Sequence, residues 1–147
     1  MLKPNFTIQD LTRHMNKSID KIEKAIVMRL VRLGEECVNK ARTERGYTDR
    51  TGNLVSSVGY VVVANGEIIS KGFESSKGST DGVEKGRKLA ERLSADFPTG
   101  YALIVVAGMD YAYHVEAGGR NVLSTAENYA KQRLPELLKQ LKQNINK

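Results

Sequence analysis

The chain is poor in the residues that disulfides, metal centres and catalytic dyads require. Its 147 residues include one cysteine, Cys37, and two histidines, His14 and His114. A single cysteine excludes an internal disulfide and a cysteine-cluster zinc site, and Cys37 lies in an apolar helical register typical of a small core residue. No serine has the flanking sequence of a nucleophile elbow. We therefore expect no enzyme activity, with no catalytic residue, no metal and no cofactor.

His114-Val115-Glu116 is similar to an enzyme motif, the histidine and glutamate of the zinc deaminases. That site also needs a later Pro-Cys-x-x-Cys pair to complete the zinc coordination, and no cysteine follows Cys37. Alternating residues over 111–117 instead predict a half-buried strand with His114 and Glu116 on one face. The neighbouring Gly118-Gly119-Arg120 could approach an anion, but a turn between a strand and a helix needs the same glycines, and we favour the turn.

Long apolar runs are also missing. The longest mostly apolar run, residues 101–109, is too short to span a bilayer. No apolar segment follows residues 1–5 to act as a secretory signal. We expect a soluble, intracellular protein without membrane contact.

Long runs of one charge are absent as well. The net charge is +6, which permits a nucleic-acid partner, but it is spread over the chain: residues 1–50 carry 11 basic and 7 acidic groups, residues 51–100 carry 6 and 6, and residues 101–147 carry 6 and 4. Tyr111 and Tyr113 have acidic neighbours, which argues against single-strand recognition. Duplex DNA inside a ring would need only weak positive charge. A DNA-binding accessory protein that uses basic helix faces is therefore the alternative function.

What the sequence does have is one long helical stripe. Its apolar residues recur at intervals of three and four: Ile8, Leu11, Met15, Ile19, Ile22, Ile26, Leu30, Leu33, Cys37 and Ala41. Thr7 and Asp10 predict the start of this helix, and Gly46 lies just past its end. A continuous helix over 8–44 would be about 55 Å long, and a domain of this size has a diameter of roughly 40 Å. The overhang predicts oligomerisation, because an apolar face without cover must be buried against another chain.

A break in this helix around Asn16–Ser18 is the other interpretation, with the second half folded onto its own sheet. Both interpretations stay open at this point.

The rest of the chain predicts short strands and two further helices. Val58 to Ala64 is a β-branched strand, Asn65-Gly66 is a hairpin turn, and Glu67 to Gly72 is the partner strand. We then expect a serine-rich mobile loop over 73–79 and a helix that begins at a capping box of Asp81 and Glu84 and ends at Ala95. Strands are expected over 101–107 and 111–117. The last helix begins at a capping box of Ser124 and Glu127, and Pro135 should kink or restart it near Leu134.

The expected fold is α+β and forms a single domain over residues 1–147. A long N-terminal helix and a C-terminal helix pack on a mostly antiparallel sheet of about four strands, with an inserted helix between the two strand pairs.

Two short motifs give the chain a specific resemblance. The first is Thr51-Gly52-Asn53-Leu54, followed by Ser57-Val58, and the second is Tyr111-Ala112-Tyr113, followed by Val115-Glu116 and Gly118. With the long helix, they resemble the minor tail-component, or tail-completion, family of long-tailed double-stranded DNA bacteriophages. The resemblance covers about residues 20–70 and 100–140, and the loop and helix of about 73–98 are expected to be an insertion.

The resemblance implies a structural protein of a phage or prophage, assembled in the bacterial host cytoplasm and located in the virion. It would join or complete the neck or upper tail by forming a ring. The implied partners are further copies of itself, other neck or tail proteins and non-specific duplex DNA, with no small-molecule substrate. We further hypothesise that Leu54 and Tyr111 pack the sheet against the first helix, while Glu116 fixes the turn into the last helix.

Overall fold

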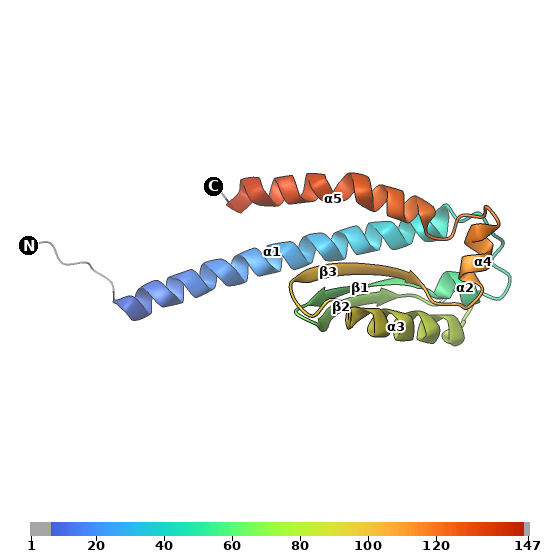
Figure 1. The fold of residues 1–147 in the computed structure, drawn as a ribbon, viewed down its shortest axis with the longest axis horizontal. Helices are drawn as coiled ribbons and strands as arrows, with labels where there is room; N and C mark the ends of the chain where they lie inside the picture. The colour runs from blue at the N-terminus through green and yellow to red at the C-terminus, as the bar shows by residue number, and fades with distance from the viewer. Residues whose placement is uncertain (1–6, 146–147) are drawn as a thin grey trace, which may run out of the picture.

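The computed structural model describes residues 7–145. Its helices and strands follow one another as α1 (Ile8–Thr43), α2 (Asn53–Ser56), β1 (Val58–Ala64), β2 (Glu67–Phe73), α3 (Thr80–Ser94), β3 (Tyr101–Ala107), α4 (Ala112–Ala117) and α5 (Ser124–Ile145). These elements form three layers (Figure 1): α1 and α5 lie on one face of the sheet, and α3 lies on the other. The expected α+β class is confirmed.

The sheet has three antiparallel strands in the order β2-β1-β3, one fewer than the expected number of about four. Val61 on the central strand pairs with Lys71 on one side and with Ile104 on the other. The predicted Asn65-Gly66 hairpin is present, and both residues have positive φ, 51° and 84°. That geometry belongs to the tight turns whose twist matches the flanking strands.

Alternation along the strands divides the core between the two faces of the sheet. Val58 on β1 packs with Leu33 and Cys37 of α1 and with Ala126 and Leu137 of α5. The opposite face forms a second cluster, in which α3 covers the sheet: Val61, Val63, Ala90, Ile104 and Val106. Because β1 is buried on both faces, its sequence is a continuous apolar run and does not alternate between apolar and polar residues.

α1 is one continuous helix of 36 residues, about 54 Å long. The predicted cap is confirmed: Asp10 donates its backbone N–H to the Thr7 hydroxyl, and the Thr7 backbone N–H donates to the Asp10 carboxylate. The alternative break at Asn16–Ser18 is wrong, because the Ser18 hydroxyl donates to the carbonyl of His14 within the helix instead of capping a new one.

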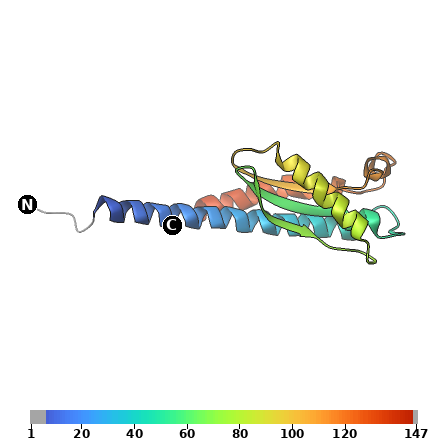
Figure 2. The ribbon, with the colours of Figure 1, turned by 90° about the horizontal axis from the view of Figure 1, so that it is seen from below.

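The N-terminal part of α1 extends beyond the sheet and α3 (Figure 2). α5 runs beside α1, and its last residues lie next to Ser18, Lys21 and Ile22 in the N-terminal half of α1. Before that point the apolar stripe faces solvent: Ile8 is 83% exposed, Leu11 46%, Met15 55% and Ile19 49%. The predicted overhang is therefore present.

The predicted strand over 111–117 is wrong, since Ala112–Ala117 is the short helix α4. Its turns are closed by hydrogen bonds from the Ala112 N–H to the Met109 carbonyl (3.0 Å) and from the Val115 N–H to the Tyr111 carbonyl (3.1 Å). Ala112 and Val115, three residues apart, face the core, whereas His114 is exposed. A short alternating run fits either period, and here the helical one applies.

The helices after the hairpin begin at slightly different residues than expected. Ser79 caps α3, accepting from the Gly82 N–H at 3.3 Å, so the predicted capping box at Asp81 and Glu84 is wrong. α3 is a full layer of the fold, and Ala90 within it is completely buried. Gly86 allows α3 to lie close to the backbone of Ser57, because a Cβ at this position would collide with the Ser57 carbonyl.

α5 begins at Ser124, but Glu127 does not close a capping box with it: the Glu127 carboxylate lies 3.0 Å from Lys131 instead. The helix continues through Pro135 without restarting, so of the two predicted outcomes only a kink stays a prediction. Leu137 and Leu141 are buried on the two turns after the proline, and this packing holds the helix together despite the missing backbone donor. Within residues 7–145, no helix combines the length and hydrophobicity needed to cross a bilayer.

Candidate functional site

The two sequence motifs meet at the end of the molecule opposite the start of α1 (Figure 1). Leu54 from the first motif and Ala112 from the second belong to one buried cluster with Met109 and Val122. This cluster lies beside α2 and α4, apart from the packing of α1 on the sheet. The hypothesis that Leu54 and Tyr111 pack the sheet against the first helix is therefore wrong, and Tyr111 is 41% exposed.

The motif residues differ widely in burial. Gly52, Leu54 and Ala112 are buried, and Asn53 and Glu116 are half-buried. The exposed members are Thr51, Tyr111, Tyr113 and Gly118. Some motif residues thus pack in the core at this end of the molecule, and others form part of its surface.

The motif pocket, as we name it, is a cavity of about 410 Å³ between the two motifs. It is lined by residues 47–51 together with Leu54, Tyr111, Val115 and Arg120. Leu54 and Val115 give it an apolar wall, and the remaining side chains supply hydroxyl groups, two guanidinium groups and one carboxylate.

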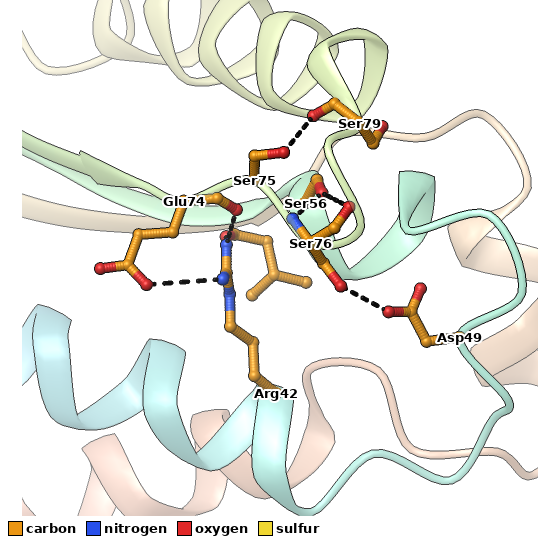
Figure 3. A network of polar contacts seen from close by, with 8 residues as sticks. Arg42, Asp49, Ser56, Glu74, Ser75, Ser76 and Ser79 are labelled. Atoms are coloured by element: carbon orange, nitrogen blue, oxygen red, sulfur yellow. Dashed lines mark hydrogen bonds and ion pairs between the residues drawn. The ribbon is translucent and has the colours of Figure 1, made fainter.

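The serine-rich segment after β2 holds Asp49 and Ser56, the residues on either side of the first motif (Figure 3). The Ser76 N–H donates to the Ser56 hydroxyl at 2.6 Å, and the Ser76 hydroxyl donates to the Asp49 carboxylate at 2.6 Å. Asn53 accepts from the hydroxyl of Ser79. The expectation of a mobile linker over 73–79 is not supported by these contacts, because the segment bridges the motif to the start of α3.

Gly52 explains why the first motif contains a glycine. Its φ is +82°, which L-residues with a side chain rarely adopt, and a Cβ at this position would collide with the carbonyl oxygen of Ser76. Arg42, at the end of α1, reaches the same segment and donates to the carbonyls of Glu74 (2.6 Å) and Val58 (3.1 Å) (Figure 3). The first motif, the serine-rich segment and α1 are therefore tied together.

Glu116 performs the role expected of it in the second motif. Its carboxylate accepts from the backbone N–H groups of Val122 (2.5 Å), Leu123 (3.2 Å) and Ser124 (2.8 Å), and from the Ser124 hydroxyl. Burial would raise the pKa of the Glu116 carboxyl, but the hydrogen bonds from Ser124, Val122 and Leu123 lower it below its ordinary value overall. Glu116 therefore binds the turn before α5 as an anion.

A second set of backbone contacts holds the loop before α5 against the end of α1. The Gly46 N–H donates to the carbonyl of Asn121 at 2.9 Å, and the Asn121 amide donates to the carbonyl of Glu44 at 2.8 Å. The Asn121 side-chain oxygen accepts from the Thr125 N–H at 3.1 Å. The two loops that line the motif pocket are thus joined to each other at the end of α1.

The charged groups of the pocket are unevenly paired. Arg50 and Arg120 are exposed and take part in no ion pair within residues 7–145. Asp49 is 9% exposed and is occupied by Ser76. Burial raises the pKa of the Tyr47 hydroxyl to about 12, and that buried hydroxyl has no hydrogen-bond partner among the described residues.

This arrangement suits binding better than acid–base chemistry. The pocket lining contains no histidine or cysteine, and its two tyrosines and two arginines carry hydrogen-bond donors. His114 lies outside the pocket and packs edge-on against the Tyr113 ring, with centroids 5.8 Å apart. Within residues 7–145, no three histidine, cysteine or carboxylate side chains gather in a way that could hold a metal ion.

Sequence reasoning missed two members of this site, Tyr47 and Arg50. The sequence placed Arg120 next to two glycines and raised an anion contact there, but nothing local indicated that Tyr47 and Arg50 would stand opposite it. No protein-family model, curated protein or solved structure matches this chain.

Proposed function

We propose that the protein is a structural virion assembly protein of a phage or prophage that joins or completes the neck or upper tail by self-association into a ring. The observation that carries this proposal is the exposed stripe on the N-terminal part of α1. Ile8, Leu11, Met15 and Ile19 share one helix face and lack intramolecular cover.

Burial of this stripe against another chain would release considerable free energy. A fully buried large aliphatic side chain contributes about 1.5–3 kcal/mol relative to an exposed one, so four such residues contribute several kcal/mol. Association itself costs roughly 4–15 kcal/mol, and the stripe alone does not reliably exceed that cost. A stable assembly therefore needs a second contact surface on each subunit.

The face formed by α5 and β3 offers that second surface. Leu138 is 55% exposed, and a groove of about 420 Å³ between α5 and β3 is lined by Leu103, Val105 and Leu134, among others. β3 is also an edge strand, because it pairs with β1 alone. A subunit with two different apolar surfaces supports head-to-tail contacts, and such contacts generate rings when the rotation closes.

The DNA-binding alternative has weaker support. On α3, basic and acidic side chains pair along the helix, with Arg87 at 2.6 Å from Glu91 and Lys88 at 3.1 Å from Glu84. These pairs leave little excess positive charge on that face for phosphate contacts. α1 carries similar pairs, such as Arg32 with Glu36 at 3.2 Å.

Native mass measurement over a dilution series, with electron microscopy of the same sample, tests the proposal. We expect concentration-dependent closed rings whose formation does not require DNA. A monomer at every concentration, which retains duplex DNA in a salt-dependent way, would instead favour the DNA-binding alternative.

The role in the particle has its own genetic test. Early termination of the encoding gene in its phage or prophage should leave filled heads and tails that do not join. Normal yields of infectious particles from that mutant would contradict the proposal, even if the isolated protein forms rings.

A further inference from the structure

We propose that the motif pocket binds a carboxylate group carried by a neighbouring polypeptide. The pocket's volume of about 410 Å³ lies in the range typical of ligand sites, and it admits a side chain rather than a helix. Ring formation is not a premise here, because the site lies on the isolated protein and far from the exposed stripe of α1 (Figure 1).

Two guanidinium groups line the pocket from different loops. Arg50 comes from the loop after α1, and Arg120 comes from the loop after α4. Neither is engaged in an ion pair within the described part of the chain. A planar guanidinium matches the geometry of a carboxylate and can donate two parallel hydrogen bonds to it. The pocket therefore has charge and donors ready for a small planar anion.

The acid in the lining is already occupied. The Asp49 carboxylate accepts from the Ser76 hydroxyl, and the Lys77 ammonium donates to the Asp49 backbone carbonyl. Two arginines against one aspartate leave the lining with an excess of one positive charge, and Lys77 adds a second next to it. This excess of positive charge attracts an anion such as a carboxylate.

The neutral donors of the pocket point to the same ligand. Tyr47 and Tyr111 both line the pocket. The Tyr47 hydroxyl is buried, whereas Tyr111 is 41% exposed and its hydroxyl can donate a hydrogen bond. Thr48 and Thr51 add hydroxyl groups that can donate to a carboxylate oxygen.

The walls indicate that the carboxylate belongs to a polypeptide. Leu54 and Val115 form an apolar side that would contact the methylene groups of an acidic side chain. A duplex presents its phosphates in rows along a rod, and recognition of such a row needs basic residues spread along a surface rather than two at one concave spot. The geometry thus favours an aspartate or glutamate side chain, or a chain terminus, of a protein partner.

Titration by two-dimensional NMR with N-acetyl-glutamate N-methylamide, a capped glutamate, tests the proposal on the full chain. We expect saturating shifts of the amide signals of residues 48–52 and 115–120. The capped glutamine analogue should cause no saturating shift, because it has the same shape without the charge. An equal response to both compounds would overturn the proposal.

Substitution of the two arginines connects the response to the pocket. Arg50→Gln with Arg120→Gln should weaken capped-glutamate binding at least about tenfold, because charge-assisted hydrogen bonds are lost. Arg92→Gln is the matched control, since Arg92 is exposed on α3, away from the motif pocket, and it should leave binding unchanged. Unchanged binding in the double variant would overturn the proposal.

Two further probes identify the source of the anion. Inorganic phosphate and succinate should bind the same amides more weakly than capped glutamate does. Tighter saturable binding of phosphate would reassign the pocket to phosphate groups, and tighter binding of succinate would reassign it to free dicarboxylates. Either result would overturn the assignment to a polypeptide carboxylate.

Discussion

The carboxylate of Glu116 accepts a hydrogen bond from the backbone N–H of Ser124 at 2.8 Å, at the first residue of α5. Helices need acceptors for their first N–H groups, and Ser124 with Glu127 would be the local solution. Here a residue from α4 supplies the acceptor instead. The second motif therefore sets where the last helix begins.

Glu116→Gln should lower the free energy of unfolding by about 1–2 kcal/mol at neutral pH, because the amide keeps the shape but loses the charge that strengthens four hydrogen bonds. Urea unfolding followed by circular dichroism measures this. Glu127→Gln is the control: its only ion pair among residues 7–145, with Lys131, is on the surface and should contribute less than about 0.5 kcal/mol. Equal losses in the two variants would contradict the role assigned to Glu116.

The contribution of Glu116 should depend on pH in one direction. The pKa of its carboxyl is lowered in the folded state, although burial alone would raise it, because Ser124, Val122 and Leu123 donate hydrogen bonds to the anion. The stabilisation is therefore complete above the unfolded-state pKa of about 4.3 and is lost as the pH falls through the lower folded-state pKa. The difference between wild type and Glu116→Gln should shrink over that acidic range. A difference that grows as the pH falls would contradict the assignment.

Tyr47 should control part of the alkaline stability. Burial raises the pKa of its hydroxyl to about 12 in the folded protein. Its neutral form is thus stabilised below the unfolded-state pKa of about 10, and that stabilisation is lost as the pH rises toward 12. Tyr47→Phe should weaken this alkaline dependence and raise stability at neutral pH by about 1 kcal/mol, because an unpartnered buried hydroxyl is removed.

Tyr113→Phe is the matched control for that experiment, since the Tyr113 side chain is 77% exposed. Thermal unfolding at several alkaline pH values should show the same profile for this variant as for wild type. A loss of stability in Tyr47→Phe at neutral pH would mean that its hydroxyl is hydrogen-bonded after all.

Gly34 should not tolerate a methyl group. A Cβ there would lie 2.5 Å from Cδ2 of Tyr60 and 2.7 Å from Cγ, and the Tyr60 hydroxyl is held by Glu35 at 2.6 Å. Gly34→Ala should therefore cost about 1–3 kcal/mol, more than the helix propensity gained from alanine. Gly118→Ala, where the nearest atom would be at 3.4 Å, should unfold like wild type in the same urea experiment.

Leu54→Asp should abolish soluble folded protein, for a different reason than the sequence suggested. Leu54 is 5% exposed and packs with Met109, Ala112 and Val122 at the motif end, so a charge there would be buried without a partner. Leu138→Asp is the control, because Leu138 is 55% exposed. Soluble Leu54→Asp protein with wild-type unfolding would refute this packing.

The elements with strong local signals could be predicted from the sequence. The stripe from Ile8 to Ala41 and the Thr7–Asp10 cap specify α1, and the positive φ values required at Asn65-Gly66 specify the hairpin. These features depend on residues close together in the chain. The helix α4 was missed because six residues are too few to distinguish a helical from an alternating period.

The motif pocket depends on contacts that local patterns do not encode. Tyr47 and Arg120 are brought together by the Gly46–Asn121 backbone contact, between residues far apart in the sequence. The composition of the serine-rich segment predicted only a loop. Its hydrogen bond to Asp49 depends on where α3 lies in the fold, which the local sequence does not indicate. The cap of α5 was likewise assigned to local residues, whereas Glu116 supplies it through tertiary structure.

Sedimentation equilibrium of wild type and of Met15→Gln tests whether the uncovered stripe of α1 joins one subunit to the next. Met28→Gln is the matched control, since Met28 is 70% exposed on the same helix but lies outside the stripe. We expect wild type and Met28→Gln to form the same oligomer, while Met15→Gln dissociates at a higher protein concentration. Equal masses for all three proteins at every concentration would contradict this expectation.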